Sequence, residues 1–358
     1  MSVDLKIEPV RRSVLLTTIS HLHEPPRFLA SAVEFATRHT LENLRIIFVS
    51  ALFNPQASNS WKDFTRAPGP ADSVVQDGTQ GISHTEHWDD VQRLLTFVYA
   101  QATKVAQEMG KVLMDIDVLL KGSEEQLPES LIQDAEHVFC VAPRHTPLPP
   151  LPPSFEQHRA DFLWLRPDDH NAHHPATSSS APTSRTGLPP FYPVVALGGT
   201  FDHLHAGHKI LLSMAAWIAS EKLIVGITDD PLLVKKVNRE VLENISVRTA
   251  RTRAFLELFK PRLEYDIVPL NDVYGPTAWD PNIQALVVSK ETLSGAASIE
   301  KIRREKALST LRVFVIDVIS STEASVDSDD AEALKKAKLS STFIREWIVQ
   351  QQQSSRPI

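Results

Sequence analysis

The segment GGTFDHLHAGH, at positions 198–208, brings together residues that can bind a phosphate group. Gly198 and Gly199 permit a sharp turn and let an anion approach the main chain closely, and Thr200 adds a hydroxyl. His205 and His208 are three residues apart, so at the start of a helix both imidazoles project to the same side. Free amides and the helix dipole favour anions there. The segment therefore predicts a site for phosphoryl-type transfer, in which positioned donors stabilise charge.

Two other interpretations of this segment are compatible with the sequence. A glycine pair after a strand is common in turns, and a single histidine is most often structural. The pattern H-x-H-x-x-H at positions 203, 205 and 208 could instead bind zinc, with a carboxylate such as Asp202 or a water as the fourth ligand. Asp202 would have to bend back toward the imidazoles to serve. We therefore predict phosphate binding and no metal ligands in this chain.

The elements around the segment indicate how it is positioned. Strand-like apolar runs alternate with helical patterns in the second half. The predicted strands are Pro193–Gly198, Lys222–Thr228, Leu263–Val268, Ala285–Ser289 and Arg312–Ile316, and the predicted helices are His208–Ser220, Ser246–Phe259, Ser294–Leu308 and Thr342–Gln350. This alternation predicts a doubly wound parallel sheet of five strands, in which ligands bind beyond the carboxyl ends of the strands. The segment follows the first of these strands.

The first half predicts a second, smaller α/β domain. Its predicted strands are Val14–Ile19, Leu44–Val49, Val112–Leu119 and Val138–Ala142, and its predicted helices are Pro26–Arg38 and Trp88–Gly110. We expect this domain over residues 1–165, a disordered Pro/Ser/His linker over 166–190 and the catalytic domain over 191–358. A long loop is expected at about 53–87. The sequence shows no internal repeat, and the HxH pair of His21 and His23 is interpreted as loop residues.

Composition excludes several classes of function. A net charge of −7 and a pI near 6.1 argue against nucleic-acid binding, which favours a basic face. No apolar run reaches the length of a membrane span. The single cysteine, Cys140, cannot form an internal disulfide, which suits a reducing compartment. We therefore expect a cytoplasmic protein.

Several motifs resemble one family. GTFDHLHAGH resembles the signature of the nucleotidyltransferase superfamily with the (H/T)xGH motif. VGITDDPLLVKK, SVRTARTRAFL, NDVYGPTAWD, VVSKET and LSSTFIREW resemble the eukaryotic-type phosphopantetheine adenylyltransferases, over about residues 194–350. The resemblance implies a Rossmann-like fold and the reaction of ATP with 4′-phosphopantetheine to give dephospho-coenzyme A and pyrophosphate. It implies that Mg²⁺ accompanies ATP.

The same resemblance implies roles for individual residues. Catalytic roles fall on His208, Thr200 and Lys235. Contacts to ATP fall on Gly198, Gly199, Phe201, His205, Arg304, Ser340, Ser341, Thr342 and Arg345, and contacts to the acceptor on Thr200, Lys235, Lys236 and Lys290. The spacing leaves open which of Lys235 and Lys236, and which of Arg303 and Arg304, reaches a phosphate.

Other functions remain as alternatives. A cytidylyltransferase would share GTFDHLHAGH but should lack the SKET and SSTFIR context, and a non-catalytic scaffold would use the first half as its main surface. We expect the first half to bind partners, with other enzymes of the coenzyme A pathway as first candidates. Because every phosphate-binding motif follows the linker, we expect residues from about Thr186 onward to fold and catalyse alone.

Overall fold

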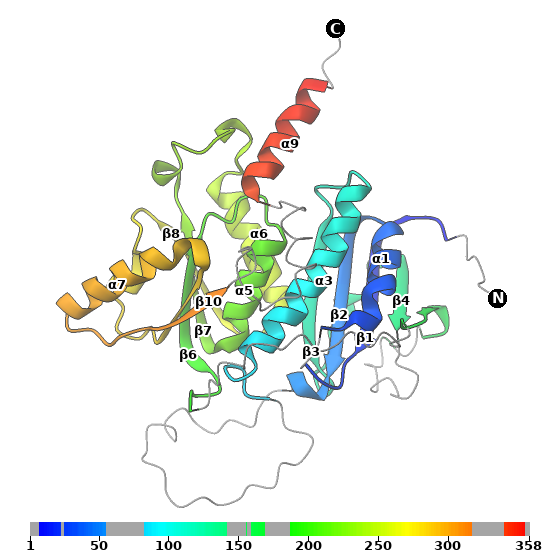
Figure 1. The fold of residues 1–358 in the computed structure, drawn as a ribbon, viewed down its shortest axis with the longest axis horizontal. Coiled ribbons are helices and arrows are strands. Elements are labelled where there is room, and N and C mark those ends of the chain that lie inside the picture. Colours follow the sequence, from blue (N-terminus) through cyan, green and yellow to red (C-terminus); the bar gives the residue numbers. More distant parts are fainter. Residues whose placement is uncertain are drawn as a thin grey trace, which may run out of the picture.

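The chain forms two parallel sheets, one in each half (Figure 1). The computed structural model describes residues 7–22, 25–54, 82–141, 155, 159–168, 187–316 and 340–354. Most of the predicted linker and of the predicted loop lies outside the described residues. The domain boundaries therefore stay predictions, although each sheet falls within one predicted domain. No helix in the described ranges combines the length and apolarity that crossing a membrane requires.

Four of the five strands of the first sheet are segments that are buried along most of their length, as expected for parallel strands covered on both faces. Its elements in chain order are β1 (Val10–Thr18), α1 (Ala30–Arg38), β2 (Thr40–Ser50), α3 (Trp88–Glu108), β3 (Asp115–Gly122), β4 (His137–Val141) and β5 (Leu163–Leu165). The strands lie in the order β3-β2-β1-β4-β5, and all pairs are parallel. The edge strand β3 is the one nearest the second half (Figure 1).

The second sheet confirms the predicted five-stranded α/β fold. Its elements are β6 (Tyr192–Gly199), α5 (Ala206–Ile218), β7 (Ala219–Thr228), α6 (Ile245–Phe259), β8 (Glu264–Leu270), β9 (Ala285–Ser289), α7 (Leu293–Glu305), β10 (Arg312–Ile316) and α9 (Ser341–Ser354). The order β10-β9-β6-β7-β8 is parallel throughout. Short 3₁₀ helices occur at Arg27–Leu29, Ala51–Phe53, Glu129–Leu131, Arg159–Asp161, Asp230–Leu232, Arg239–Val241, Gly275–Ala278 and Lys290–Thr292.

The two sheets repeat one topology. In each, the strands stand side by side in the order third, second, first, fourth, fifth of their appearance in that half. The first sheet therefore matches the second in strand number, and it contains one strand more than the four predicted in this half. The missing strand was β5, whose three residues are too few to show a periodic pattern. The sequence does not reveal that the two halves have the same strand order, because the similarity lies in the topology and extends to only a few residues.

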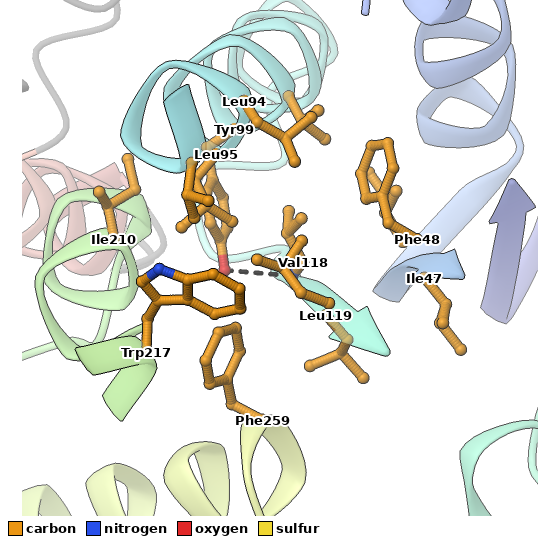
Figure 2. Close-up of a cluster of buried hydrophobic side chains, with 14 of the residues drawn as sticks. Ile47, Phe48, Leu94, Leu95, Tyr99, Val118, Leu119, Ile210, Trp217 and Phe259 are labelled. Carbon is orange, nitrogen blue, oxygen red and sulfur yellow. Dashed lines mark hydrogen bonds between the residues drawn. The ribbon is translucent and has the colours of Figure 1, made fainter. Parts of the chain in front are cut away.

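The two halves share one hydrophobic core. Helix α5 is apolar around almost its whole circumference, which is typical of a helix buried on all sides. Figure 2 shows Ile210 and Trp217 of α5 and Phe259 of α6 beside side chains of α3 and β3. In the same cluster the amide of Val118 donates a hydrogen bond to the Tyr99 hydroxyl, at 3.1 Å. The face of the second half that carries α5 and α6 is thus covered by the first half.

Trp217, one residue before the end of α5, is bound by the first half in several ways. Its indole stacks on the His84 imidazole, with ring centroids 3.7 Å apart, and lies edge-on to Phe53. Its Nε1 donates to the His84 carbonyl at 3.0 Å, and His84 Nδ1 donates to the Trp217 carbonyl. Burial, with a smaller contribution from Lys260, lowers the pKa of His84 to about 3. His84 is therefore neutral at physiological pH.

Because the pKa of His84 is lowered in the folded protein, we predict that the protein loses stability in acid. When the pH falls below about 6.5, His84 takes up a proton in the unfolded chain but not in the folded one, until the folded pKa near 3 is reached. The free energy of unfolding should therefore decrease between pH 6.5 and 3. His84→Asn keeps a donor but cannot titrate, so its urea-unfolding free energy should depend less on pH over this range. An unaltered pH dependence of the unfolding free energy in His84→Asn would contradict the assignment.

Candidate active site

The GGTFDHLHAGH segment leaves the carboxyl end of β6, and its last residues begin α5. Phe201 and His203 both adopt left-handed backbone conformations, with φ of 51° and 45°. Non-glycine residues rarely hold this conformation, and such residues often occur at functional sites. The Phe201 ring folds back onto Gly199, where an added Cβ would lie 3.0 Å from a ring carbon. Gly199 is therefore needed for the shape of the loop.

The two predicted phosphate-binding histidines lie together at the start of α5. Their rings stack with centroids 3.9 Å apart and an interplanar angle of 26°, and Phe201 contacts His208 edge-on. His205 Nδ1 accepts a hydrogen bond from the Gly207 amide at 3.2 Å, which leaves Nε2 as the protonated nitrogen. Buried Nδ1 of His208 has no hydrogen-bond partner among the described residues. Nδ1 of His208 is therefore a buried imidazole nitrogen that no described residue binds.

Both imidazoles are neutral at physiological pH. Burial, together with His203 and Lys209, lowers the pKa of His205 to about 3. Burial, His205 and then Lys236 lower the pKa of His208 well below its usual value. Neutral imidazoles act on phosphoryl oxygens as hydrogen-bond donors, and a bound polyanion would favour their protonation. The pair can therefore donate to phosphate without a prior charge.

The N-terminus of α9 meets the loop. Ser341 Oγ donates to the Asp202 carbonyl at 2.9 Å and lies 3.5 Å from His205 Nε2. Ser340 Oγ accepts a hydrogen bond from the Phe343 amide, as an ordinary N-cap does, and Thr342 is exposed in the first turn. Two helix N-termini, of α5 and α9, are thus brought to one place from opposite ends of the second half. This is a favourable place for a polyphosphate.

Arg345 joins α9 to the loop. Its side chain is almost fully buried, and its Nη1 lies 2.6 Å from Oδ2 of the buried Asp202. Its Nε donates to the Val237 carbonyl at 2.8 Å, and its Nη2 to the Thr342 hydroxyl at 3.3 Å. All three guanidinium nitrogens are therefore bonded within the protein. The contact of Arg345 with ATP stays a prediction, while the contacts present assign it to holding α9 against the motif.

The predicted basic residues are distributed unequally around the motif. Lys235 and Lys236 are both exposed in the segment after β7, but only Lys236 is among the charges that act on His208. Lys290 follows β9 directly and is exposed at the same edge of the sheet. Arg304 lies in the last turn of α7, roughly three turns from the end that follows β9, and reaches toward Glu300. The structure does not bring Arg304 to the motif.

Arg303 has a different role. Its buried guanidinium donates to the carbonyls of Ser309, Thr277 and Asp280, at 2.7, 2.8 and 2.9 Å. These bonds fix the loop before β9 to the end of α7. Of the two arginines left open by the spacing, Arg303 is thus a structural residue.

Arg248 is a residue of the site that sequence reasoning missed. Its buried guanidinium donates from Nη1 to the carbonyls of Thr200, at 2.9 Å, and Thr228, at 2.8 Å, and from Nε to that of Glu243. It therefore ties the ends of β6 and β7 together beneath the motif. In the sequence it is one of three arginines in SVRTARTR, and nothing in the spacing marks it as the buried one.

The three histidines of the motif do not form one metal-ligand set. Within the described ranges, the group with suitable geometry for a metal is Asp202, His203 and Glu243. Its carboxylates are engaged by arginines: Asp202 by Arg345, and Glu243 by Arg251 at 2.6 Å. Charge pairing within the protein explains this group.

Comparison with known proteins gives a consistent result for the second half. A family model described as cytidylyltransferase-like matches residues 196–347. A phosphopantetheine adenylyltransferase of Saccharomyces cerevisiae is 48% identical over 152 residues, which cover 42% of this chain and 47% of the yeast protein. An uncharacterised protein of Schizosaccharomyces pombe is 41% identical over 153 residues, 43% of this chain and 47% of that protein. The chain spans about half the length of these two relatives.

An archaeal relative is matched over most of its length. A phosphopantetheine adenylyltransferase of Pyrobaculum aerophilum is 36% identical over 125 residues, which cover 35% of this chain and 79% of the archaeal protein. The match is thus to nearly a whole protein of that name, and it agrees with the motif loop, the paired imidazoles and the α9 N-terminus found here. The chain belongs to the phosphopantetheine adenylyltransferase family of nucleotidyltransferases.

Proposed function

We propose that this protein transfers the adenylyl group of ATP to the phosphate of 4′-phosphopantetheine, giving dephospho-coenzyme A and pyrophosphate, as a step of coenzyme A biosynthesis. The observation that carries the proposal is the junction of the α5 and α9 N-termini, where the paired imidazoles of His205 and His208 adjoin Ser341. The names of the yeast and archaeal relatives support the choice of acceptor.

The proposed chemistry needs positioning and charge stabilisation. An oxygen of the acceptor phosphate attacks the α-phosphorus in line, the bond from that phosphorus to the bridging oxygen breaks, and pyrophosphate leaves with the electron pair. Thr200 and Lys290 would hold the acceptor at the carboxyl edge of the sheet. His208 would donate to the α-phosphoryl oxygens, and His205 and Ser340 to the β- and γ-phosphates. Ser341, whose hydroxyl donates to the Asp202 carbonyl, would contribute through its main-chain amide at the start of α9. No covalent enzyme intermediate is needed.

Mg²⁺ would enter with ATP. The carboxylates nearest the motif, Asp202 and Glu243, are already paired with arginines, so they offer little to a metal ion. The phosphates of ATP and water would then supply most ligands, which is how Mg²⁺ is usually held in such sites. The ion would neutralise the charge of the leaving pyrophosphate.

The test is a comparison of substrates. The purified full chain is incubated with ATP or CTP and with phosphopantetheine or glycerol phosphate, and pyrophosphate release is followed. We expect turnover with ATP and phosphopantetheine. Turnover with CTP and glycerol phosphate would instead establish a cytidylyltransferase, and no turnover with any pair would favour the scaffold alternative.

The two adjacent lysines should differ in their contribution. Because the charge of Lys236 helps to lower the pKa of His208, we propose that Lys236 is the lysine that neutralises phosphate charge. Lys236→Ala should lower kcat/KM for ATP by about ten- to a hundredfold, since hydrogen bonds to charged groups are worth roughly 1.5–3 kcal/mol. Lys235→Ala is the matched control and should stay within about threefold of wild type. The reverse order would restore Lys235 to the catalytic role first predicted for it.

Two further expectations remain proposals. We propose a cytoplasmic location, for which the support is that the single cysteine, Cys140, cannot form an internal disulfide. Binding of another coenzyme A pathway enzyme by the first half also stays a proposal, to be tested by co-purification with such enzymes.

A further inference from the structure

We propose that the first half is a catalytically silent copy of the same fold, and that it positions the catalytic helix α5 through Lys209. The inference rests on the proposed function for its kinetic readout only. It combines a repeated topology, a degenerate copy of the motif and a buried ion pair between the two halves.

The motif has a counterpart in the first half. TISHLHEPP, at positions 18–26, can be aligned with TFDHLHAGH, at positions 200–208, and the two share T, H, L and H at the same spacing. Each string lies at the end of the first strand in its sheet, and the two sheets have the same strand order. Topology and sequence therefore agree that the two halves are copies of one unit.

The copy has lost the residues that would bind phosphate. Pro25 and Pro26 stand where the active motif has Gly207 and His208, and LT at 16–17 replaces the glycine pair. A proline has no amide hydrogen, so this turn cannot offer the free donors of a helix N-terminus. The 3₁₀ helix and α1 that follow it show no side-chain cap. We therefore assign no nucleotide site to the first half.

Lys209 links this silent copy to the catalytic helix. It follows His208 directly in α5, and its side chain is 3% exposed. Its ammonium lies 2.6 Å from Asp117 Oδ1 and 2.9 Å from the Ile116 carbonyl, and it also pairs with Asp115, all on strand β3 of the first half. All three donors of the ammonium are thus engaged by one strand. Burial lowers the pKa of Lys209, but Asp117 and Asp115 outweigh this effect and raise it overall.

The first half also holds the other end of the helix. Trp217 is stacked on His84 and joined to it by two hydrogen bonds, so α5 is fixed near both termini by the same half. A helix held at two points has little freedom to slide or rotate. Because the imidazoles of His205 and His208 stand on its first turn, the position of Lys209 sets where they meet the phosphates. Misplacement by about 1 Å can cost a hundredfold in rate.

The test uses full-length variants of the ion pair. Lys209→Met leaves Asp117 buried without its partner and risks unfolding, so Lys209→Met is also combined with Asp117→Asn, which removes both charges. We expect the double variant to stay folded and its kcat to be about ten- to a hundredfold lower than that of the wild type. Its KM for ATP should differ from the wild-type value by less than about threefold. The imidazole NMR signals of His205 and His208 should shift.

Lys121→Met is the matched control. Lys121 is a second buried lysine of β3, and its ammonium binds the Leu258 and Phe259 carbonyls at the far end of α6, at 3.2 and 2.9 Å. Loss of the Lys121 ammonium should destabilise the protein but leave kcat and both imidazole signals as in wild type.

The claim that the first half is silent is tested by calorimetric titration of the wild-type chain with a non-hydrolysable ATP analogue. The titration should give one nucleotide site per chain.

Specific outcomes overturn the proposal. Wild-type kcat and unshifted imidazole signals in the double variant would remove Lys209 from positioning, as would equal loss of kcat in Lys121→Met. Two nucleotide sites per chain would show that the first half is not silent. Absence of transferase activity in the wild type would refute the proposed function alone, because the NMR signals and the binding stoichiometry are measured without turnover.

Discussion

Replacing His208 by alanine is expected to lower kcat by about 10²–10³-fold, which corresponds to roughly 2.7–4 kcal/mol of transition-state stabilisation. The neutral imidazole stands at the start of α5, stacked on His205 and flanked by Phe201. Its donor would meet charge that develops on the α-phosphoryl group only during transfer. The dissociation constant of ATP should therefore change much less than kcat, because the ground state gains little from this contact.

The measurement is kcat together with the ATP dissociation constant and the metal content of the purified variant. His203→Asn is the matched control: it removes an imidazole from the same loop, and asparagine tolerates the left-handed conformation found there. That variant should stay within a few-fold of wild type. A structural His208 would show near-normal kcat in folded protein, and a metal ligand would show metal loss. Either result would take His208 out of the mechanism.

The parts of the site that are local in sequence were predictable. The glycine turn, the i,i+3 histidines and the serines that open α9 each lie within one short segment, and each segment follows a strand or begins a helix. Their meeting at one edge follows from the parallel sheet, since the carboxyl ends of parallel strands lie together. The fold of the second half was predictable for the same reason, because its strand and helix periods are regular.

The roles of the arginines were not predictable, because they depend on burial. Arg248, Arg303 and Arg345 are each completely or almost completely buried and bind main-chain carbonyls or Asp202. An arginine near a phosphate motif suggests a phosphate ligand, yet a guanidinium can equally satisfy carbonyls at the ends of strands. Sequence spacing does not distinguish the two uses.

Contacts between the two halves could not be predicted either, because they too depend on which residues are buried. Lys209 pairs with Asp115 and Asp117, more than ninety residues earlier in the chain. In the sequence Lys209 directly follows the phosphate-binding motif, and nothing in the spacing shows that it is buried or paired with the first half. The positions of the motifs predict that the second half acts alone, but they carry no information on the surfaces of α5 and α6 that the first half buries.

Residues 187–354 expressed alone are therefore expected to lose activity, contrary to that earlier expectation. Removing the first half would expose the apolar side chains of Ile210, Trp217 and Phe259 and leave Lys209 without its carboxylates. An exposed apolar face of this kind favours association or aggregation. The fragment should have low solubility, bind the dye ANS and give a broad thermal transition in place of a cooperative one.

The archaeal relatives make this a sharp test. The match to the second half accounts for 79% of the Pyrobaculum aerophilum protein, so a domain of this family is nearly a complete protein there. The fold itself thus does not require a first half, and the requirement must come from this chain's own α5 and α6 surfaces.

Co-expressing residues 7–168 as a separate chain should restore solubility and kcat to the fragment, since the ion pair and the Trp217 contacts can form between two chains. Co-expression of the same piece carrying Asp117→Asn and Asp115→Asn should restore much less of kcat. A soluble, cooperatively folded fragment with wild-type kcat by itself would show that the first half contributes nothing to the position of α5.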